Sequence, residues 1–275
     1  WLETPVLALA GIIQTIPSLA LLAIMVPLLA SLQLQSIGFL PAFVGLTLYG
    51  VLPILRNTVT GIAGVNPAQR EAARAVGMTE AQQLRRVELP LALPVIIAGL
   101  RTATVWTVGI ATLSTPVGAT SLGNYIFSGL QTRNYAAVLV GCVAAAVLAL
   151  LLDSLVRGHE IGIRTRRRRF IAVVGTTIAI LYLYAGFTLA ATLLPRDDPT
   201  ITIGAKGFTE QYVLAEVLGQ WVERETGHPT NQMQSLGSMV AFDAMVAGDI
   251  DVLVDYTGTL WANVLKRTTA GINRD

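Results

Sequence analysis

The chain alternates between long apolar stretches and short polar ones over most of its length. A helix needs about 20 apolar residues to cross the ~30 Å hydrocarbon layer of a membrane. Five stretches reach or approach this length, at approximately residues 6–32, 38–55, 88–112, 136–156 and 170–194. Several contain Pro or Gly, which membrane helices tolerate where neighbouring helices satisfy the freed backbone groups. The pattern therefore predicts a polytopic α-helical membrane domain with mutually packed helices.

Beyond Pro195 the pattern becomes that of a soluble α/β domain. TITIG alternates like a strand, and the helical pattern after it ends at Gly227. A second strand, a helix, a buried strand and the start of another helix follow, at 230–235, 238–248, 250–256 and 257–266. This order predicts a parallel or mixed sheet with ligand-binding loops at the carboxyl ends of its strands. Because about 75 residues are too few for a whole domain of this kind, we expect a piece of a longer chain, incomplete at both ends.

Composition and charge support this division. With 53% hydrophobic and 13% charged residues, the chain suits a largely membrane-embedded protein better than a soluble one. Residues 1–195 hold 13 arginines and 6 acidic residues, a net charge of +7. Residues 196–275 hold 6 basic and 11 acidic residues, a net charge of −5. The change of sign marks a domain boundary near Pro195.

The arginines also predict the orientation in the membrane. They gather in segments 56–86 and 157–169, whereas segment 113–135 has only Arg133. Positively charged loops stay in the cytoplasm, so 113–135 and everything after Pro195 are expected outside. RTRRRRF could instead bind nucleic acid, but its place directly before an apolar stretch favours the topological interpretation. We therefore expect the lipid bilayer as a partner, with its anionic inner leaflet against this cluster, and no nucleic acid.

The sequence offers no catalytic or metal-binding constellation. Cys142 lies in an apolar run and is expected to face the protein core or lipid, without a disulfide partner. His159 and His228 have no metal ligand at a useful spacing and are expected at the surface. The chain also lacks a GxxxxGK(S/T) stretch for ATP. We expect no enzymatic activity, no metal and no cofactor.

One polar, helical segment, 66–90, lies between two apolar stretches. Its opening Asn-Pro pair predicts a helix that ends at Gly77, and a capping-box pattern at Thr79 predicts a second helix directly after it. Glu71 and Arg74 are expected to form a surface pair. Four small or compact residues give the first helix a smooth side: Ala72, Ala73, Ala75 and Val76. Such a segment either rests on lipid or contacts another protein, and its lack of large apolar residues favours a protein.

The same segment carries a family resemblance. EAARAVGMTEAQQLRRVELP, residues 71–90, resembles the EAA motif of ABC-importer permeases. The motif positions are Glu71, Ala72, Ala73, Gly77, Val87, Leu89 and Pro90, with Val87 where isoleucine is more usual. QTIPSLALLAIMVPLL (14–29) and LYGVLPILRNTVTGI (48–62) resemble the branch that imports glycine betaine, choline, carnitine and related quaternary-ammonium solutes. The resemblance covers nearly all of 1–156, and GATSLGNYIF (118–127) departs from the more frequent GAGGLG.

The resemblance implies a type I importer permease fold and a division of labour. The EAA segment would be the coupling helix that docks on a separate ABC ATPase subunit, which binds and hydrolyses the ATP. The chain would be a transport subunit in the bacterial cytoplasmic membrane, paired with a second copy of itself. Its C-terminal domain would lie on the external side.

Two further segments resemble the extracellular binding proteins of the same importer branch. They are GAKGFTEQYVLAEV (204–217) and IDVLVDYTGT (250–259), and the resemblance implies that Gln211, Tyr256 and Thr259 line the ligand cleft. Aromatic faces suit a quaternary ammonium, which cannot donate a conventional hydrogen bond, and Gln and Thr can bind a polar end. Tyr256 could instead pack on the helix after it. Lys206 is a weaker cleft candidate, Met239 replaces a more frequent polar residue, and Trp221 and Trp261 are expected in the core.

Together these features predict a permease fused to its own binding domain. The expected parts are a membrane domain (1–158), a basic linker (159–169), a connecting helix (170–194) and an external domain (200–275). Fusion would keep the receptor at a high effective concentration over the translocation path. Two alternatives remain: the same transporter type importing ergothioneine or an amino-acid-like metabolite, and a membrane-anchored solute sensor.

Overall fold

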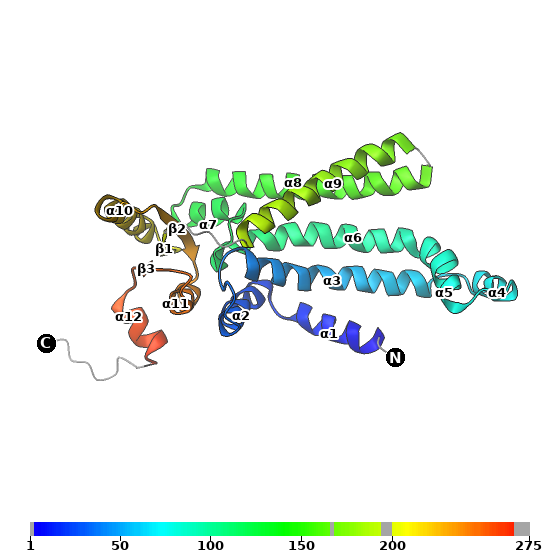
Figure 1. The fold of residues 1–275 in the computed structure, drawn as a ribbon, viewed down its shortest axis with the longest axis horizontal. Coiled ribbons are helices and arrows are strands. Elements are labelled where there is room, and N and C mark those ends of the chain that lie inside the picture. The colour runs from blue at the N-terminus through cyan, green and yellow to red at the C-terminus, as the bar shows by residue number, and fades with distance from the viewer. Residues whose placement is uncertain (1–2, 166–167, 194–199, 267–275) are drawn as a thin grey trace. The chain divides into compact units, whose positions relative to one another are not determined.

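A computed structural model describes residues 3–165, 168–193 and 200–266 (Figure 1). The helices of the first 193 residues are α1 (Glu3–Thr15), α2 (Ser18–Ser31), α3 (Phe39–Ala63), α4 (Pro67–Ala75), α5 (Glu80–Gln83), α6 (Leu89–Thr112), α7 (Gly123–Gln131), α8 (Tyr135–Thr165) and α9 (Arg168–Leu193). A π-helical turn, η1 (Leu84–Glu88), joins α5 to α6, and a short 3-10 turn, η2 (Thr115–Val117), precedes α7. The described residues form two compact units, one built on 3–18, 45–111 and 143–193, the other on 19–44, 112–142 and 200–266.

Three of the five predicted apolar stretches are confirmed as membrane-length helices. Among the described residues, Phe39–Ala63, Glu80–Thr112 and Tyr135–Gly162 are long and apolar enough to cross a membrane. The stretch predicted at 170–194 is also helical, as α9, although its apolar part, Ala172–Thr188, is shorter. The helix α8 continues through Thr165, into the stretch that was expected to be a linker.

The first apolar stretch differs from the prediction. Residues 6–32 do not form one helix, because α1 ends at Thr15 and α2 begins at Ser18. Pro17 lies between them; it has no N–H to donate, and its ring disfavours a helical conformation at the residue before it. The apolar pattern runs on through the proline, so hydrophobicity alone could not locate the break.

Small residues bring α3 and α6 together in antiparallel order within the first unit (Figure 1). A Cβ atom at Gly99 would lie 2.6 Å from Asn57 Cβ and 2.8 Å from the Pro53 carbonyl oxygen. A Cβ atom at Gly61 would lie 3.1 Å from the Ala92 carbonyl oxygen. Helices in a membrane associate through such close backbone approach, since lipid supplies no hydrophobic driving force between them.

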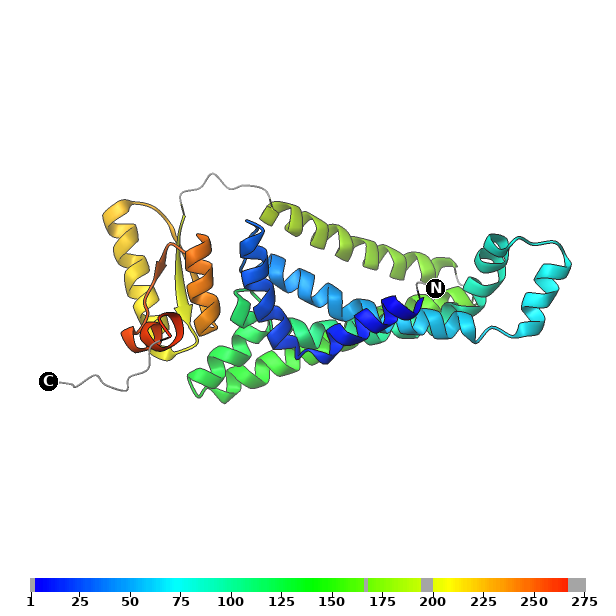
Figure 2. The ribbon, with the colours of Figure 1, turned by 90° about the horizontal axis from the view of Figure 1, so that it is seen from below.

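The C-terminal part of the second unit contains a three-stranded parallel sheet. Its elements are β1 (Ile201–Lys206), α10 (Thr209–Thr226), β2 (Thr230–Leu236), α11 (Ser238–Ala247), β3 (Val252–Leu253), α12 (Thr257–Thr259) and the π-helical η3 (Leu260–Val264). The strand order is β2-β1-β3, and α10 and α11 lie on opposite sides of the sheet (Figure 2). Ile203, Ala205 and Ala215 form a buried core between β1 and α10. The predicted β-α-β-α order is confirmed.

The third strand is shorter than the sequence indicates. The apolar stretch 250–256 predicted a full buried strand, yet β3 contains only Val252 and Leu253, which are half-buried and pair with Ile203 and Gly204. Within the described residues β3 is an edge strand, so only one of its sides has a partner. A run of apolar residues indicates that a segment is buried. The length of a strand depends instead on how many of its residues find a hydrogen-bonding partner in a neighbouring strand.

Two loops from the mainly helical first part of the chain contact this α/β part within the second unit. The backbone N–H and the hydroxyl of Ser36 both donate to Asp249 Oδ2, at 2.7 and 2.5 Å. The Gly237 N–H donates to the Pro116 carbonyl, at 3.0 Å. These contacts involve the loop before α3 and the η2 turn, which belong to the segments flanking the membrane-length helices.

The close approach of α3 and α6 predicts the effect of one added methyl group. Gly99→Ala should destabilise the protein by about 1–3 kcal/mol, because the methyl group meets backbone and Cβ atoms that cannot move aside. Gly109→Ala in the same helix is the matched control, since among the described residues its added Cβ would meet nothing within 4 Å beyond its own stretch of helix. Thermal unfolding in detergent micelles measures the difference. Equal midpoints for the two variants would show that α3 and α6 are not packed at Gly99.

Candidate functional site

The carboxyl ends of β1 and β3 are joined by a buried ion pair. Lys206 ends β1, Asp255 follows β3, and the Lys206 ammonium donates to Asp255 Oδ1. Their side chains are only 1% and 8% exposed. A buried charge is tolerated when it is paired and hydrogen-bonded, so each residue makes the burial of the other possible. Lys206, a weaker cleft candidate from the sequence, is thus occupied by a carboxylate of its own chain.

Tyr256 is held at both ends beside this pair. Its backbone N–H donates to Asp255 Oδ1 at 2.7 Å, and its hydroxyl donates to Glu210 Oε1 at 2.7 Å. The residue is 41% exposed, so its ring is accessible. Glu210 lies in the first turn of α10. Its own backbone N–H and then the Tyr256 hydroxyl hold the pKa of the Glu210 carboxyl below its usual range, so that carboxyl is ionised at neutral pH.

Gln211, the next residue of α10, is the most unusual polar group in this region. It is only 1% exposed, and neither its Oε1 nor its Nε2 atom makes a hydrogen bond of ordinary geometry among the described residues, although the amide lies near the Tyr256 hydroxyl. Burying an amide without a partner costs about 1–3 kcal/mol, so such groups are characteristically satisfied by a bound molecule or serve function. The structure therefore places an unpaired amide next to the residue that anchors Tyr256.

Thr259, the third predicted cleft residue, lies one turn beyond Tyr256. It is half-buried, and its backbone N–H donates to the Tyr256 carbonyl at 3.0 Å at the start of α12. The structure thus connects Tyr256 to the first turn of α10 through Glu210 and to Thr259 through the backbone. Sequence reasoning missed Glu210 and Asp255, although both are acids inside the two segments that carried the resemblance.

The predictions for the tryptophans of this part fare differently. Trp221 was expected in the core, but it is 59% exposed on α10, so that prediction is wrong. The helix buries its opposite face, through Ala215 and Gly219, against the sheet, and an isolated Trp in an amphipathic pattern does not reveal its side. Trp261 is half-buried in η3. Met239, 49% exposed, lies in the first turn of α11.

The EAA segment forms the two capped helices that the sequence predicts. Asn66 Oδ1 accepts a hydrogen bond from the Ala68 N–H at 2.9 Å, and Gly77 ends the first helix with φ +80°. Thr79 and Gln82 form a reciprocal capping box at the start of α5. From there the helix is continuous to Thr112, with a π turn where the third membrane stretch was expected to begin.

A polar network, missed by the sequence analysis, fastens these helices to the membrane helices. Arg70 Nε lies 3.2 Å from Glu88 Oε1, and Arg70 Nη2 donates to the Ile62 carbonyl at the end of α3. Gln83 Nε2 donates to the same Glu88 oxygen at 2.6 Å. Arg74 Nε contacts Gln83 Oε1 at 3.3 Å, so within the described residues it pairs with Gln83 rather than with Glu71, contrary to prediction.

This network decides which EAA residues remain accessible. The exposed motif residues are Glu71, Ala72, Gly77 and Pro90, whereas Leu89 is half-buried. Ala73 was expected on the smooth outer side of the first helix, but it is only 5% exposed and faces inward. Val76, 72% exposed, lies at the end of that helix beside the glycine. The accessible surface therefore centres on one end and one face of α4.

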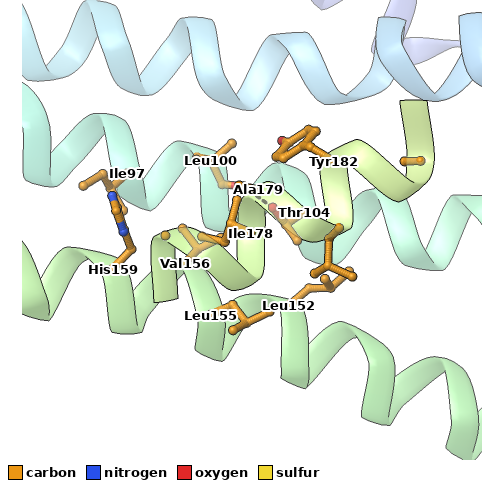
Figure 3. Close-up of a pocket in the computed structure, with 13 residues that line it drawn as sticks. Ile97, Leu100, Thr104, Leu152, Leu155, Val156, His159, Ile178, Ala179 and Tyr182 are labelled. Atoms are coloured by element: carbon orange, nitrogen blue, oxygen red, sulfur yellow. Dashed lines mark hydrogen bonds between the residues drawn. The ribbon is translucent and has the colours of Figure 1, made fainter. Parts of the chain in front are cut away.

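A largely apolar cavity of about 610 Å³ lies in the first unit between α6, α8 and α9 (Figure 3). Its polar lining side chains are Thr104, His159 and Tyr182, and the Thr104 hydroxyl donates to the Leu100 carbonyl at 2.9 Å. His159 was expected at the surface, but it is half-buried here, whereas His228 is exposed as predicted. The lining contains no formally charged Arg, Lys, Asp or Glu, so it does not match a strongly charged solute.

The Lys206–Asp255 pair makes a stability prediction. Asp255→Ala should cost about 3–5 kcal/mol, because it leaves the Lys206 ammonium buried without a partner. Chemical unfolding followed by circular dichroism measures the loss. Glu225→Ala, at an exposed acid of α10, is the control and should change little. The double variant Lys206→Met with Asp255→Leu should recover much of the loss; an Asp255→Ala variant as stable as the control would contradict the buried pair.

Known families match both parts of the chain. Residues 1–165 match the family described as binding-protein-dependent transport system inner membrane component. Residues 199–274 match the substrate binding domain of ABC-type glycine betaine transport system. The second match begins at residue 199, just after the change in pattern and charge near Pro195.

Individual relatives agree with these families. The chain is 48% identical over 148 residues to the choline transport system permease protein OpuBB of Bacillus subtilis, covering 54% of this chain and 65% of that protein. It is 44% identical over 161 residues to the osmoprotectant import permease protein OsmW of Salmonella typhimurium, covering 58% and 74%. It is 32% identical over 277 residues to the ergothioneine transport permease/ergothioneine binding protein EgtU of Helicobacter pylori, covering 94% and 48%.

The chain thus spans about two thirds of the length of these permeases and about half of the fused protein. Its predicted fold class and family are confirmed by the family matches and the membrane-length helices. The chain belongs to the binding-protein-dependent transport system inner membrane component family, with a match to a substrate-binding domain following its membrane helices.

Proposed function

We propose that this chain is the transmembrane subunit of an ATP-driven importer of quaternary-ammonium solutes, with a fused domain that captures the solute outside. The observation that carries the proposal is the group of side chains at the ends of β1 and β3. An accessible tyrosine held by a carboxylate adjoins a buried amide that makes no hydrogen bond of ordinary geometry within the part of the chain that the structure describes. Capture at this group is the function that these residues can perform.

The chemistry of the group suits a trimethylammonium compound. Such a cation cannot donate a conventional N–H hydrogen bond, so it is held by aromatic faces, each contributing about 0.5–2 kcal/mol. The ionised Glu210 carboxyl beside the Tyr256 hydroxyl adds negative charge on the same side. Gln211 and Thr259 supply hydrogen-bonding groups for the polar end of the solute. Further cleft residues would come from the part of the domain beyond this chain.

Ergothioneine is the main alternative solute. It also carries a trimethylammonium group and a carboxylate, so the same residues suit it. The similarity to EgtU favours it, because that protein combines a permease and a binding protein, and the likeness extends over 94% of this chain. An amino-acid-like metabolite without the quaternary nitrogen would leave the accessible aromatic face without a role.

The energy would come from a separate ABC ATPase subunit. The accessible end and face of α4, with Glu71, Ala72, Val76 and Gly77, form a small surface suited to a protein groove. The Arg70–Glu88 contact and its network would transmit a push on this surface to α3 and α6. A second copy of the chain would complete the translocation path, as in the family to which it belongs.

The arginine distribution supports an external position for the C-terminal domain. Segments 56–86 and 157–169 would face the cytoplasm. The contacts of Ser36 and Pro116 with Asp249 and Gly237 put the α/β part beside loops expected on the opposite side. A membrane-anchored sensor would not need the EAA segment, so transport accounts for more of the chain.

Binding by the full-length protein tests the capture site. Gln211→Leu should lower solute affinity about tenfold or more while stability stays equal or rises, because it removes a buried unpaired amide. Calorimetry with glycine betaine, choline, carnitine and ergothioneine measures affinity, and thermal unfolding measures stability. Trp221→Leu, at an exposed aromatic of the same helix, is the control. Unchanged affinity for every solute that the wild type binds would remove Gln211 from the site.

ATP hydrolysis tests the coupling surface. Glu71→Lys should abolish the solute-stimulated part of ATP hydrolysis by the reconstituted transporter, because it reverses a charge on the face that docks on the ATPase. Solute binding by the external domain should stay at the wild-type level. Glu225→Lys makes the same charge change on α10 and should leave hydrolysis unaffected. Normal stimulation in the Glu71 variant would place the docking surface elsewhere.

A further inference from the structure

An ion pair links α6 and α8 inside the membrane-length part of the first unit. Arg101 Nε donates to Asp153 Oδ1 at 2.7 Å, and Arg101 Nη2 donates to Asp153 Oδ2 at 2.8 Å. This is the two-point, parallel geometry that makes arginine–carboxylate pairs strong and directional. The pair uses one edge of the guanidinium, which leaves the Nη1 atom to donate to another anionic group.

The pair lies deep in the membrane domain. Arg101 is 12 residues from the start of α6 at Leu89 and 11 residues from its end at Thr112. At 1.5 Å per residue it is about 17 Å from either end of α6, whereas Asp153 is only four residues, about 6 Å along α8, from Arg157. The pair therefore lies within the membrane-length helices, toward the side of the arginine-rich segment 157–169. Ionisable residues at such a depth are costly to keep, and they face either the protein interior or a water-filled cavity.

The pair opens onto a cavity. Both side chains remain partly accessible, at 31% and 22%. A cavity of about 410 Å³ adjoins them, lined by Ala98, Arg101, Thr102, Val105, Trp106 and Asp153. Ala98, Thr102, Val105 and Trp106 repeat along one face of α6. Trp106 is 50% exposed, so its ring is available to a molecule in this cavity.

These groups offer complementary chemistry to one class of molecule. Arg101 can bind a carboxylate, and the face of Trp106 can hold a quaternary ammonium. The Arg101–Asp153 pair has no net charge, so the cavity favours neither a simple cation nor a simple anion. It matches a molecule that is neutral overall but has separated charges, which is a zwitterion such as a betaine.

We propose that this cavity is a second, zwitterion-binding site in the permease, within its membrane-length helices. The inference rests on the proposed transport function and adds a place where the solute binds after leaving the external domain. Trp106 holds the ammonium end and Arg101 the carboxylate, while Asp153 orients Arg101 and offsets its charge. As the zwitterionic solute crosses the hydrocarbon layer, these protein groups take the place of the water molecules that hydrate its two charges.

The first test replaces Trp106 in the full-length transporter reconstituted with its ATPase subunit. Trp106→Leu should raise the KM for import of glycine betaine, carnitine or ergothioneine about 3- to 30-fold, as expected for loss of one cation–aromatic contact. Trp106→Phe, which keeps an aromatic face, should recover part of the loss. Affinity of the external domain should be unchanged in both. Leu93→Ala, at an exposed apolar residue of α6 outside this cavity, is the control.

The second test separates a binding role from a structural one. The exchange of Arg101→Asp with Asp153→Arg rebuilds an ion pair between α6 and α8 but moves the positive group to the other helix. A purely structural pair predicts that this double variant regains both stability and import. A zwitterion site predicts recovered stability with a raised KM for the zwitterions and a smaller change for choline, which has no carboxylate.

The outcomes distinguish the two proposals. If the wild type neither binds nor imports any of the four solutes, the proposed transport function is wrong. If the wild type imports a zwitterion and both Trp106→Leu and the exchanged pair do so with unchanged KM, only the second site is overturned. If Trp106→Leu loses the dimer in cross-linking and lowers the import rate while KM stays unchanged, the site is also overturned.

Discussion

The structure depends on one constraint, which is that backbone polar groups in a membrane must be satisfied by the protein itself. Helices meet this constraint residue by residue, and most of the first 193 residues are accordingly helical. The helical run is interrupted between α1 and α2, at Pro17. The helix that begins at α5 passes through a π turn just before Pro90, which has no backbone N–H to donate to the preceding turn. Glycines then let neighbouring backbones approach, as Gly99 does against α3.

Three ion pairs among the described residues link different segments of the chain. Lys206 and Asp255 join the ends of two strands, and Arg70 joins α4 to Glu88 before α6. Arg101 joins α6 to Asp153 on α8. A charge in a poorly hydrated place needs a partner, so each pair determines which elements lie together. The Lys206–Asp255 pair is almost fully buried, whereas the partly accessible Arg101–Asp153 pair lines a cavity.

The two candidate solute sites both combine an aromatic side chain with polar or charged groups, but they arrange these groups differently. In the external domain an accessible tyrosine, a carboxylate and an unpaired amide occupy the ends of parallel strands, where loops leave room for a ligand. In the membrane domain a tryptophan and a neutral ion pair lie along one helix face. The first arrangement suits capture from water, and the second suits passage through a region without water. The EAA helices are built from small, exposed residues instead, as a surface for a protein.

Local chemistry could be predicted closely from the sequence. The Asn66 cap, the Thr79 capping box, and the Gly77 and Gly227 helix ends each depend on a few neighbouring residues and a backbone conformation that glycine or a capping side chain favours. Predictions that needed to know which face is buried were less successful. Ala73 turned inward and Trp221 outward, because a helical pattern repeats on all sides until a neighbouring element covers one of them.

The sequence by itself determined where the chain is apolar, where its charge changes sign, where its capped helix ends lie, and to which family it belongs. These properties follow from residue type and spacing, which need no knowledge of the fold. Only the tertiary structure decided that Arg74 pairs with Gln83, that β3 is short, that Gln211 is buried without a partner, and that Arg101 meets Asp153. Each of these depends on contacts between segments far apart in the chain, and pairing and burial exist only once those segments have packed.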